Sequence, residues 1–112
     1  MKKKILTVCS AGLVRSVGLA DVLKVHFDAD AIPVGIDGNT KETLLMLYEW
    51  ADWIILLMGE WQDRIPQTYQ SKVKICEVGT DRFGSSRHPE LIDLVYRWTR
   101  EQRVALGLPE ER

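Results

Sequence analysis

The sequence predicts a three-layer α/β fold, in which helices cover both faces of a four-stranded parallel sheet. Short aliphatic runs alternate with longer amphipathic runs along the chain, which is the pattern of successive strand–helix units. The 112 residues are enough for one compact domain and too few for two, so residues 1–112 are expected to form a single domain. No internal repeat or low-complexity segment suggests another architecture.

The first strand, loop and helix follow one another without a gap. Residues 3–8 are rich in aliphatic side chains and predict a buried strand. Residues 9–14 form a short loop, and Ser16 is the expected N-cap of the helix that follows. Along residues 17–27 the apolar side chains recur on one helical face, which consists of Leu19, Ala20, Leu23 and Phe27.

A proline and a threonine mark the next two elements. Residues 30–36 predict a short second strand, and Pro33 favours the edge of the sheet because a missing N–H does no harm there. Thr40 is the expected N-cap of a helix that ends near Trp50. The apolar face of this helix is expected to hold Leu44, Leu45, Leu47 and Tyr48.

The second half of the chain begins with a uniformly apolar run. Residues 53–58 predict a central strand that is covered on both faces. Gly59 ends this strand, and a short helix begins at Glu60 and is closed by Pro66. Residues 72–78 predict the fourth strand.

A loop rich in glycine, serine and arginine, residues 79–89, leads to the last helix. Pro89 suits the first turn of this helix. The helix is expected to run to about residue 103 and to stop at Gly107. Its inward face is expected to hold Leu91, Leu94, Val95 and Trp98.

The order of the elements predicts the topology of the sheet. Right-handed crossovers and a change of direction after the second strand give the strand order 2-1-3-4. In such sheets ligands bind outside the carboxyl ends of the strands. The loop that starts at Cys9 follows the first strand and the loop that contains Asp81 follows the fourth, so both are expected at this edge.

Composition and charge exclude several classes of protein. The net charge is −1 and the basic residues form no continuous block, so no nucleic-acid partner is expected. The three lysines at residues 2–4 precede an apolar run of about five residues, which is too short for a signal peptide or a membrane span. We therefore expect a cytoplasmic protein without a membrane partner.

The cysteines and histidines suggest neither disulfide nor metal. Without a signal sequence, both cysteines are expected to be reduced thiols. Cys76 lies in a β-like run and is interpreted as a small buried hydrophobe. His26 and His88 lack the spacing of metal ligands, so neither a metal site nor a cofactor is predicted.

The loop between Cys9 and Arg15 has the composition of an anion site. A strand–loop–helix turn directs backbone N–H groups and the positive end of a helix at an anion. These surroundings stabilise the nucleophilic thiolate of Cys9, and Arg15 can bind two phosphate oxygens in fork geometry. Gly12 permits a positive φ or a close approach of another backbone. The residues therefore predict chemistry on an oxyanion, with phosphate the first choice.

These residues resemble the low-molecular-weight protein tyrosine phosphatases. The resemblance rests on Cys9-x5-Arg15-Ser16 at a strand–helix turn, and on Asp81-Arg82-Phe83 followed by Pro89. In element order it covers nearly the whole chain, as a short, divergent branch. It implies a phosphatase-like domain and a phosphomonoester hydrolase that acts on aryl phosphates, above all protein phosphotyrosine, through a phosphocysteine intermediate.

The resemblance also implies a role for each residue. Cys9 is the nucleophile, Arg15 binds the phosphoryl oxygens, and Asp81 is the general acid and later the base toward water. Ser16 donates a hydrogen bond to the Cys9 sulfur and helps it leave. The phosphate-binding residues implied are Ser10, Ala11, Gly12, Leu13, Val14, Arg15 and Ser16.

Three positions differ from the family pattern. Gly12 replaces an asparagine of the loop, and Val14 replaces the second cysteine that many members carry directly before the arginine. Cys9 therefore lacks a neighbouring thiol and is expected to be sensitive to oxidation. Phe83 replaces a tyrosine of the acid loop. Phe83 and Trp61, which follows the third strand, are the candidate walls of the substrate pocket.

Other functions are compatible with the same residues. Residues 9–12 (Cys-Ser-Ala-Gly) are similar to the phosphorylated loop of sugar-transport IIB components, which are phosphocarriers. Arg15 and Asp81 weigh against a carrier, because a carrier needs no acid for a leaving group. An arsenate reductase of this fold needs further cysteines that the chain lacks. A further alternative is a non-catalytic module, which would bind phosphate without turnover. The main prediction, a phosphatase, implies a phosphorylated protein or a small aryl phosphate as partner.

Overall fold

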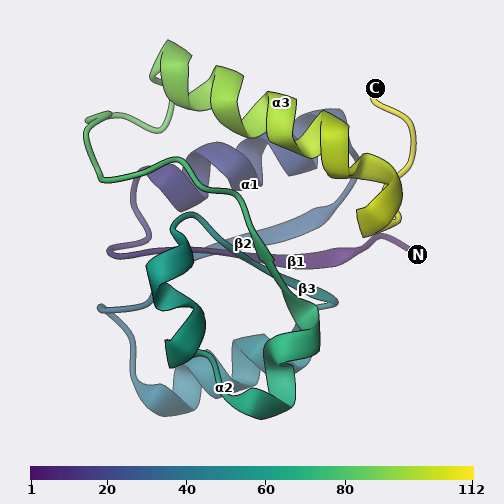
Figure 1. Cartoon of the computed structure of the whole chain (residues 1–112). Helices are drawn as coiled ribbons and strands as arrows, with labels where there is room; N and C mark the ends of the chain where they lie inside the picture. Colours follow the sequence, from purple (N-terminus) through teal and green to yellow (C-terminus); the bar gives the residue numbers. More distant parts are fainter.

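A four-stranded parallel sheet forms the middle layer of the molecule (Figure 1). The computed structural model describes residues 1–112. The strands are β1 (Lys4–Cys9), β2 (Asp30–Gly35), β3 (Trp53–Leu56) and β4 (Val73–Ile75). Their order is β2-β1-β3-β4 and every pairing is parallel, so the predicted fold class and strand order are confirmed.

Helices cover both faces of this sheet, as predicted. Two helices, α1 (Arg15–His26) and α3 (Pro89–Leu106), pack together on one face. On the other face lie α2 (Lys41–Trp50) and two short 3-10 helices, η1 (Gly59–Arg64) and η2 (Gln67–Lys72) (Figure 1). The short helices sit in the connection between β3 and β4, and η2 was not predicted from its polar sequence.

The central strands β1 and β3 are the most deeply buried part of the sheet. Val8 of β1 pairs with Val34 of β2 and with Leu56 of β3, and all three side chains are buried. Pro33 lies in β2 at the edge of the sheet, where its missing N–H leaves no partner unpaired. Cys9 is the last residue of β1, so it emerges at the middle of the carboxyl edge, flanked by β2 and β3.

The start of α1 differs from the prediction. The helix begins at Arg15, and its N-cap is Val14, whose side chain makes no capping hydrogen bond. Ser16 is therefore not the N-cap but lies inside the first turn, where its hydroxyl group contacts the sulfur of Cys9 instead. The predicted apolar face is confirmed: Leu19, Ala20, Leu23 and Phe27 are fully buried.

Helix α2 has the predicted N-cap, but its apolar face is less deeply buried than predicted. The hydroxyl of Thr40 accepts a hydrogen bond from the backbone N–H of Thr43 at 3.2 Å. Tyr48 is the one buried residue of this helix, and its three leucines are half-buried. An apolar strip of α2 therefore stays accessible beside the sheet.

The last strand and helix differ from the prediction in length. The strand β4 ends at Ile75 rather than at residue 78, although Cys76 and Val78 still donate backbone hydrogen bonds to residues 56 and 57. Helix α3 has Pro89 in its first turn, as predicted, and continues three residues beyond the expected end. It stops at Gly107, which has a φ of +72°.

One continuous hydrophobic core of 28 buried residues extends over both faces of the sheet, so a single core holds all the elements together. Phe27 and Leu91 contribute from the α1–α3 face, and Tyr48 and Ile65 contribute from the other face. None of the helices combines the length and the apolar character needed to span a bilayer.

Candidate active site

The thiol of Cys9 lies at the start of a loop, residues 10–15, which we call the cradle loop. The side chain is only 2% exposed. Its Sγ lies 3.1 Å from Oγ of Ser16, and the backbone N–H of Gly12 donates a hydrogen bond to it at 3.2 Å. When the thiol loses its proton, the Ser16 hydroxyl group can turn and donate to the sulfur as well. Both contacts then stabilise a thiolate.

The first turn of α1 is fixed against β1. The hydroxyl of Thr7 donates a hydrogen bond to the carbonyl oxygen of Ser16 at 2.8 Å. Thr7 and Ser16 are both fully buried. This hydrogen bond ties the first turn of α1 to the strand that ends at Cys9.

Two glycines allow the cradle loop to pack on the end of β2. Gly12 has a φ of +76°, and a Cβ at this residue would lie 2.5 Å from the backbone nitrogen of Gly35. A Cβ on Gly35 would lie 2.5 Å from the carbonyl carbon of Ala11. The prediction for Gly12, a positive φ or a close backbone approach, is confirmed on both counts.

Backbone hydrogen bonds continue this contact beyond β2. Ile36 donates to the carbonyl oxygen of Cys9 at 2.8 Å, and Asp37 donates to that of Ser10 at 3.0 Å. The side-chain amide of Asn39 donates to the carbonyl oxygen of Gly35 at 2.7 Å. The loop after β2 thus supports the cradle loop from outside.

The guanidinium of Arg15 is buried and has three polar contacts. Nη1 donates to the carbonyl oxygen of Gly79 at 2.9 Å and lies 3.0 Å from Sδ of Met58. Nη2 donates to the hydroxyl oxygen of Ser10 at 2.9 Å. Nε is the one buried side-chain nitrogen or oxygen without a hydrogen-bond partner. Because an unpaired buried donor is costly, an anion that offers an acceptor here would be favoured.

Two aromatic residues lie close to this arrangement. Trp61 of η1 is 6% exposed, and the centroid of its ring lies 5.3 Å from Cζ of Arg15, which is a cation–π contact. Phe83 is 5% exposed and packs within its own loop, 5.6 Å from the ring of His88. That Trp61 and Phe83 form walls of a substrate pocket stays a prediction.

Glu77 connects the loops that contact Arg15. One carboxylate oxygen accepts a hydrogen bond from the backbone N–H of Gly59 at 2.8 Å, and the other accepts from the N–H of Gly79 at 3.2 Å. Gly59 directly follows Met58. Glu77 therefore binds the backbone of Gly79 and the backbone next to Met58, the two residues that contact Nη1 of Arg15.

Asp81 is exposed in the loop between β4 and α3. It lies two residues beyond Gly79, whose carbonyl oxygen accepts the hydrogen bond from Arg15. The next residue, Arg82, donates to the carbonyl oxygen of Val78 at 2.9 Å and pairs with Glu90. This loop is therefore anchored to Arg15 on one side and to α3 on the other, while the carboxylate of Asp81 stays at the surface.

The second thiol, Cys76, differs from Cys9 in its surroundings. It is buried with 1% exposure, as predicted, and burial together with the charge of Glu77 raises its pKa far above the ordinary value. The thiol therefore keeps its proton at neutral pH. No three His, Cys, Asp or Glu side chains are grouped so that they could hold a metal ion.

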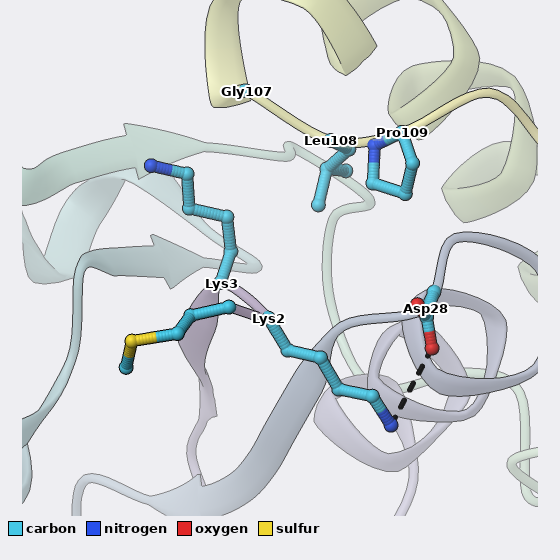
Figure 2. A pocket seen from close by; sticks show the side chains of 7 residues that line it. Lys2, Lys3, Asp28, Gly107, Leu108 and Pro109 are labelled. Carbon is cyan, nitrogen blue, oxygen red and sulfur yellow. Dashed lines mark ion pairs between the residues drawn. The ribbon is translucent and has the colours of Figure 1, made fainter.

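The largest surface hollow, about 480 Å³, lies away from this chemistry (Figure 2). It is formed by residues 1–3 and 107–109 together with Asp28, at the amino ends of β1 and β2. Figure 2 shows Lys2 reaching Asp28, with which it forms an ion pair of 3.4 Å. No cysteine, serine or threonine lines this hollow, so the cradle loop at the opposite edge remains the candidate site.

Comparison with known proteins adds structural relatives. No protein-family model and no curated protein matches the sequence. The tyrosine phosphatase AmsI from Erwinia amylovora has a TM-score of 0.70 at 16% identity, over 96% of this chain and 95% of that one. The tyrosine phosphatase Wzb from Escherichia coli K30, in complex with phosphate, has a TM-score of 0.71 at 14% identity, over 96% of this chain and 100% of that one. The chain has the fold of these phosphatases.

An arginine phosphatase shares this phosphatase fold. YwlE from Geobacillus stearothermophilus has a TM-score of 0.65 at 17% identity, over 92% of this chain and 94% of that one. The resemblance drawn from Cys9, Arg15 and Asp81 is therefore confirmed at the level of the fold.

Several residues of the site are not predictable from the sequence. Met58 and Gly79 contact Arg15, and Glu77 binds the backbone of Gly59 and Gly79. These contacts join loops that are far apart in sequence, which no local pattern reveals. Gly35 carried a usable signal, because a glycine at the end of a strand next to a glycine-containing loop indicates a close backbone approach.

Proposed function

We propose that the protein is a cysteine-dependent phosphatase that hydrolyses aryl phosphates, above all protein phosphotyrosine, in the cytoplasm. The observation that carries the proposal is the arrangement around Cys9. Its sulfur accepts a hydrogen bond from Gly12, contacts Ser16, and lies in the same loop as a buried arginine whose Nε lacks an acceptor. A phosphoryl group in the cradle loop would supply that acceptor.

In the first step the thiolate of Cys9 attacks phosphorus. An S–P bond forms, the bond between phosphorus and the aryl oxygen breaks, and Asp81 gives its proton to the leaving oxygen. Arg15 and the backbone N–H groups of the cradle loop stabilise the charge on the equatorial oxygens. The product of this step is phosphocysteine and a phenol.

In the second step water attacks the phosphocysteine. Asp81, now ionised, accepts a proton from the water, and the S–P bond breaks to release inorganic phosphate. Ser16 donates a hydrogen bond to the departing sulfur; in the resting protein Oγ of Ser16 lies 3.1 Å from Sγ and accepts from the thiol. The cycle returns Cys9 as a thiolate and Asp81 as an acid.

The structural relatives support this assignment of Cys9. One similar structure is a YwlE arginine phosphatase in which the active-site cysteine is replaced by a serine that is phosphorylated, with a TM-score of 0.64 at 17% identity over 89% of this chain. Two others are tyrosine phosphatases, one of them in complex with phosphate. Both tyrosine and arginine phosphatases therefore occur on this fold, so phosphoarginine is the comparison substrate.

Turnover of p-nitrophenyl phosphate tests the proposal. The wild type is expected to release phosphate, Cys9→Ser is expected to lose turnover by at least about a thousandfold, and Asp81→Asn is expected to slow it while Cys9 still becomes phosphorylated. Equal activity of wild type and Cys9→Ser, or no activity of either between pH 5 and 8, would reject the phosphatase.

Three further outcomes separate the alternatives. Stable phosphorylation of Cys9 by a phosphohistidine donor, without release of phosphate, would identify a phosphocarrier. Binding of phosphate without turnover of any aryl phosphate would identify a non-catalytic module. Faster hydrolysis of phosphoarginine than of phosphotyrosine would identify phosphoarginine as the substrate class and leave the proposed role of Cys9 unchanged.

A further inference from the structure

A second hollow, of about 310 Å³, lies beside the cradle loop. It opens between the loop after β2, the start of α2 and the end of η1. The residues that matter for its chemistry are Ile36, Lys41, Leu44, Leu45, Tyr48 and Arg64. Its volume falls at the lower end of the range typical of small ligand sites.

This hollow and the cradle loop share a wall. Ile36 lines the hollow, and its backbone N–H donates to the carbonyl oxygen of Cys9 at 2.8 Å. Asp37 likewise donates to Ser10 at 3.0 Å. The next residue, Gly38, has open space around it, since a Cβ there would meet no atom within 4 Å. A chain that leaves the cradle loop on this side therefore crosses a wall that is largely backbone and reaches the hollow directly.

Half of the eight residues that line the hollow are hydrophobic, and Tyr48 adds a hydroxyl group. Leu44 and Leu45 are half-buried and line the hollow. Tyr48 is 3% exposed, yet its hydroxyl makes no hydrogen bond within the protein. The hydroxyl oxygen is not completely enclosed by protein, so it reaches solvent. Tyr48 lines the hollow, which provides this opening. The site can therefore accept an apolar side chain and one polar group.

The rim of the hollow carries positive charge. Arg64 is already paired with Asp37 at 2.9 Å, whereas Lys41 is exposed and forms no ion pair. Lys41 is also the first residue of α2, where the helix end favours negative charge. An occupant with a carboxylate next to its apolar side chain fits this rim.

We propose that the hollow is a substrate subsite that binds an apolar residue and a neighbouring acidic residue of the phosphorylated polypeptide whose phosphotyrosine lies in the cradle loop. The inference rests on the proposed phosphatase function and names its substrate class: a protein rather than a small aryl phosphate. The shared wall indicates which molecule binds in the hollow, because one polypeptide can place its phosphotyrosine in the cradle loop and a neighbouring residue in the hollow.

Phosphotyrosine peptides of eight to ten residues test the proposal. In each peptide a leucine–glutamate pair occupies a different position within about four residues of the phosphotyrosine. The reference peptide carries alanine and glutamine in place of this pair. At one or two positions the pair is expected to raise kcat/KM by about fivefold to twentyfold. Leu45→Glu is expected to abolish this gain while kcat/KM for p-nitrophenyl phosphate stays within about twofold.

Two variants protect the test from misfolding. Met46→Glu, on the same helix but fully outside the hollow, is the matched control and is expected to keep the peptide gain. Lys41→Glu, at an exposed position, is expected to remove the advantage of glutamate and to keep that of leucine. The proposal is overturned if no position of the leucine–glutamate pair raises kcat/KM, or if Leu45→Glu and Met46→Glu behave alike.

A binding measurement separates this proposal from the proposed function. The Cys9→Ser variant is titrated with the same phosphotyrosine peptides carrying a fluorescent label, which requires no turnover. An affinity gain for the leucine–glutamate peptide that Leu45→Glu removes would support the subsite even if the protein hydrolysed nothing. Equal affinities for both peptides would reject the subsite even if p-nitrophenyl phosphate were turned over.

Discussion

Arg15 donates a hydrogen bond from Nη2 to the hydroxyl oxygen of Ser10, 2.9 Å away. These two residues are the first and the last of the cradle loop, so the bond closes the loop into a ring. It also uses one of the two N–H groups of Nη2 and leaves the second, together with the unpaired Nε, for an incoming anion. The side chain of Ser10 thereby fixes the plane of the guanidinium before any ligand arrives.

Removing this hydroxyl group is expected to weaken phosphate binding. Ser10→Ala loses one hydrogen bond to a charged donor, worth about 1.5–3 kcal/mol, so the Kd for inorganic phosphate should rise by about tenfold or more. Ser10→Thr keeps the hydroxyl group and should stay within about threefold of wild type. Isothermal titration measures both. Equal Kd values for Ser10→Ala and wild type would show that Arg15 holds its position without Ser10.

Glu77 is expected to act on the same arginine through the backbone. Glu77→Ala removes the acceptor for both Gly59 and Gly79, which carry or adjoin the two groups that contact Nη1. Two bonds worth about 1 kcal/mol each are lost, so phosphate affinity should fall by up to about thirtyfold. Glu77→Gln should lose less affinity, because its amide keeps one acceptor.

Glu60→Gln is the matched control for this prediction. Glu60 is an exposed acid in the first turn of η1, next to Gly59, and it makes no hydrogen bond to the loops around Arg15. The phosphate affinity of the Glu60→Gln variant should equal that of wild type. If Glu77→Ala binds phosphate as tightly as Glu60→Gln does, Glu77 has no part in positioning Arg15.

The sequence predicted those parts of the molecule that depend on local pattern. Aliphatic runs, Thr40 and Pro89 marked the strands and helix starts, and Pro33 placed β2 at an edge. The error at Ser16 has a physical origin: a hydroxyl group near a helix start was assigned to the nearest backbone N–H, whereas the sulfur of Cys9 lies 3.1 Å away and competes for it.

The site was predicted where its residues are close in sequence. Cys9, Gly12 and Arg15 belong to one turn, and their spacing alone indicates an anion site. Two residues that contact the guanidinium, Met58 and Gly79, come instead from the loops after β3 and β4. Such contacts depend on how loops meet in space, and a single sequence contains no local signal for them.

Alanine at Gly35 is expected to disrupt the cradle loop and to lower stability. The added Cβ would lie 2.5 Å from the carbonyl carbon of Ala11, and backbone on both sides cannot move away cheaply. A loss of about 2–4 kcal/mol in the free energy of unfolding is expected, with loss of phosphate binding. Urea unfolding and phosphate titration measure the two effects.

Gly38→Ala provides the comparison for Gly35. It lies three residues away in the same connection, but its Cβ would meet nothing within 4 Å. The substitution should leave stability unchanged or raise it by about 0.5–1 kcal/mol, because alanine lowers the entropy of the unfolded chain. Similar losses in Gly35→Ala and Gly38→Ala would mean that close packing on the cradle loop is not the cause.

The buried thiol of Cys76 is expected to make stability fall at alkaline pH. Burial raises the pKa of Cys76, so the folded protein keeps this proton at a pH where the unfolded chain, with an ordinary thiol pKa near 8.5, has released it. The contribution is therefore fully present below about pH 8.5 and declines above it, by up to about 1.4 kcal/mol per pH unit.

Urea unfolding between pH 7 and 10 measures this decline. Cys76→Ala, made in a Cys9→Ser background so that no other thiol titrates, should be less stable at every pH because of the cavity, but its stability should fall less steeply above pH 8.5. Burial also raises the pKa of Tyr48, which steepens both curves alike above pH 10. Parallel curves for the two proteins between pH 8.5 and 10 would show that Cys76 ionises as readily in the folded protein as in the unfolded chain.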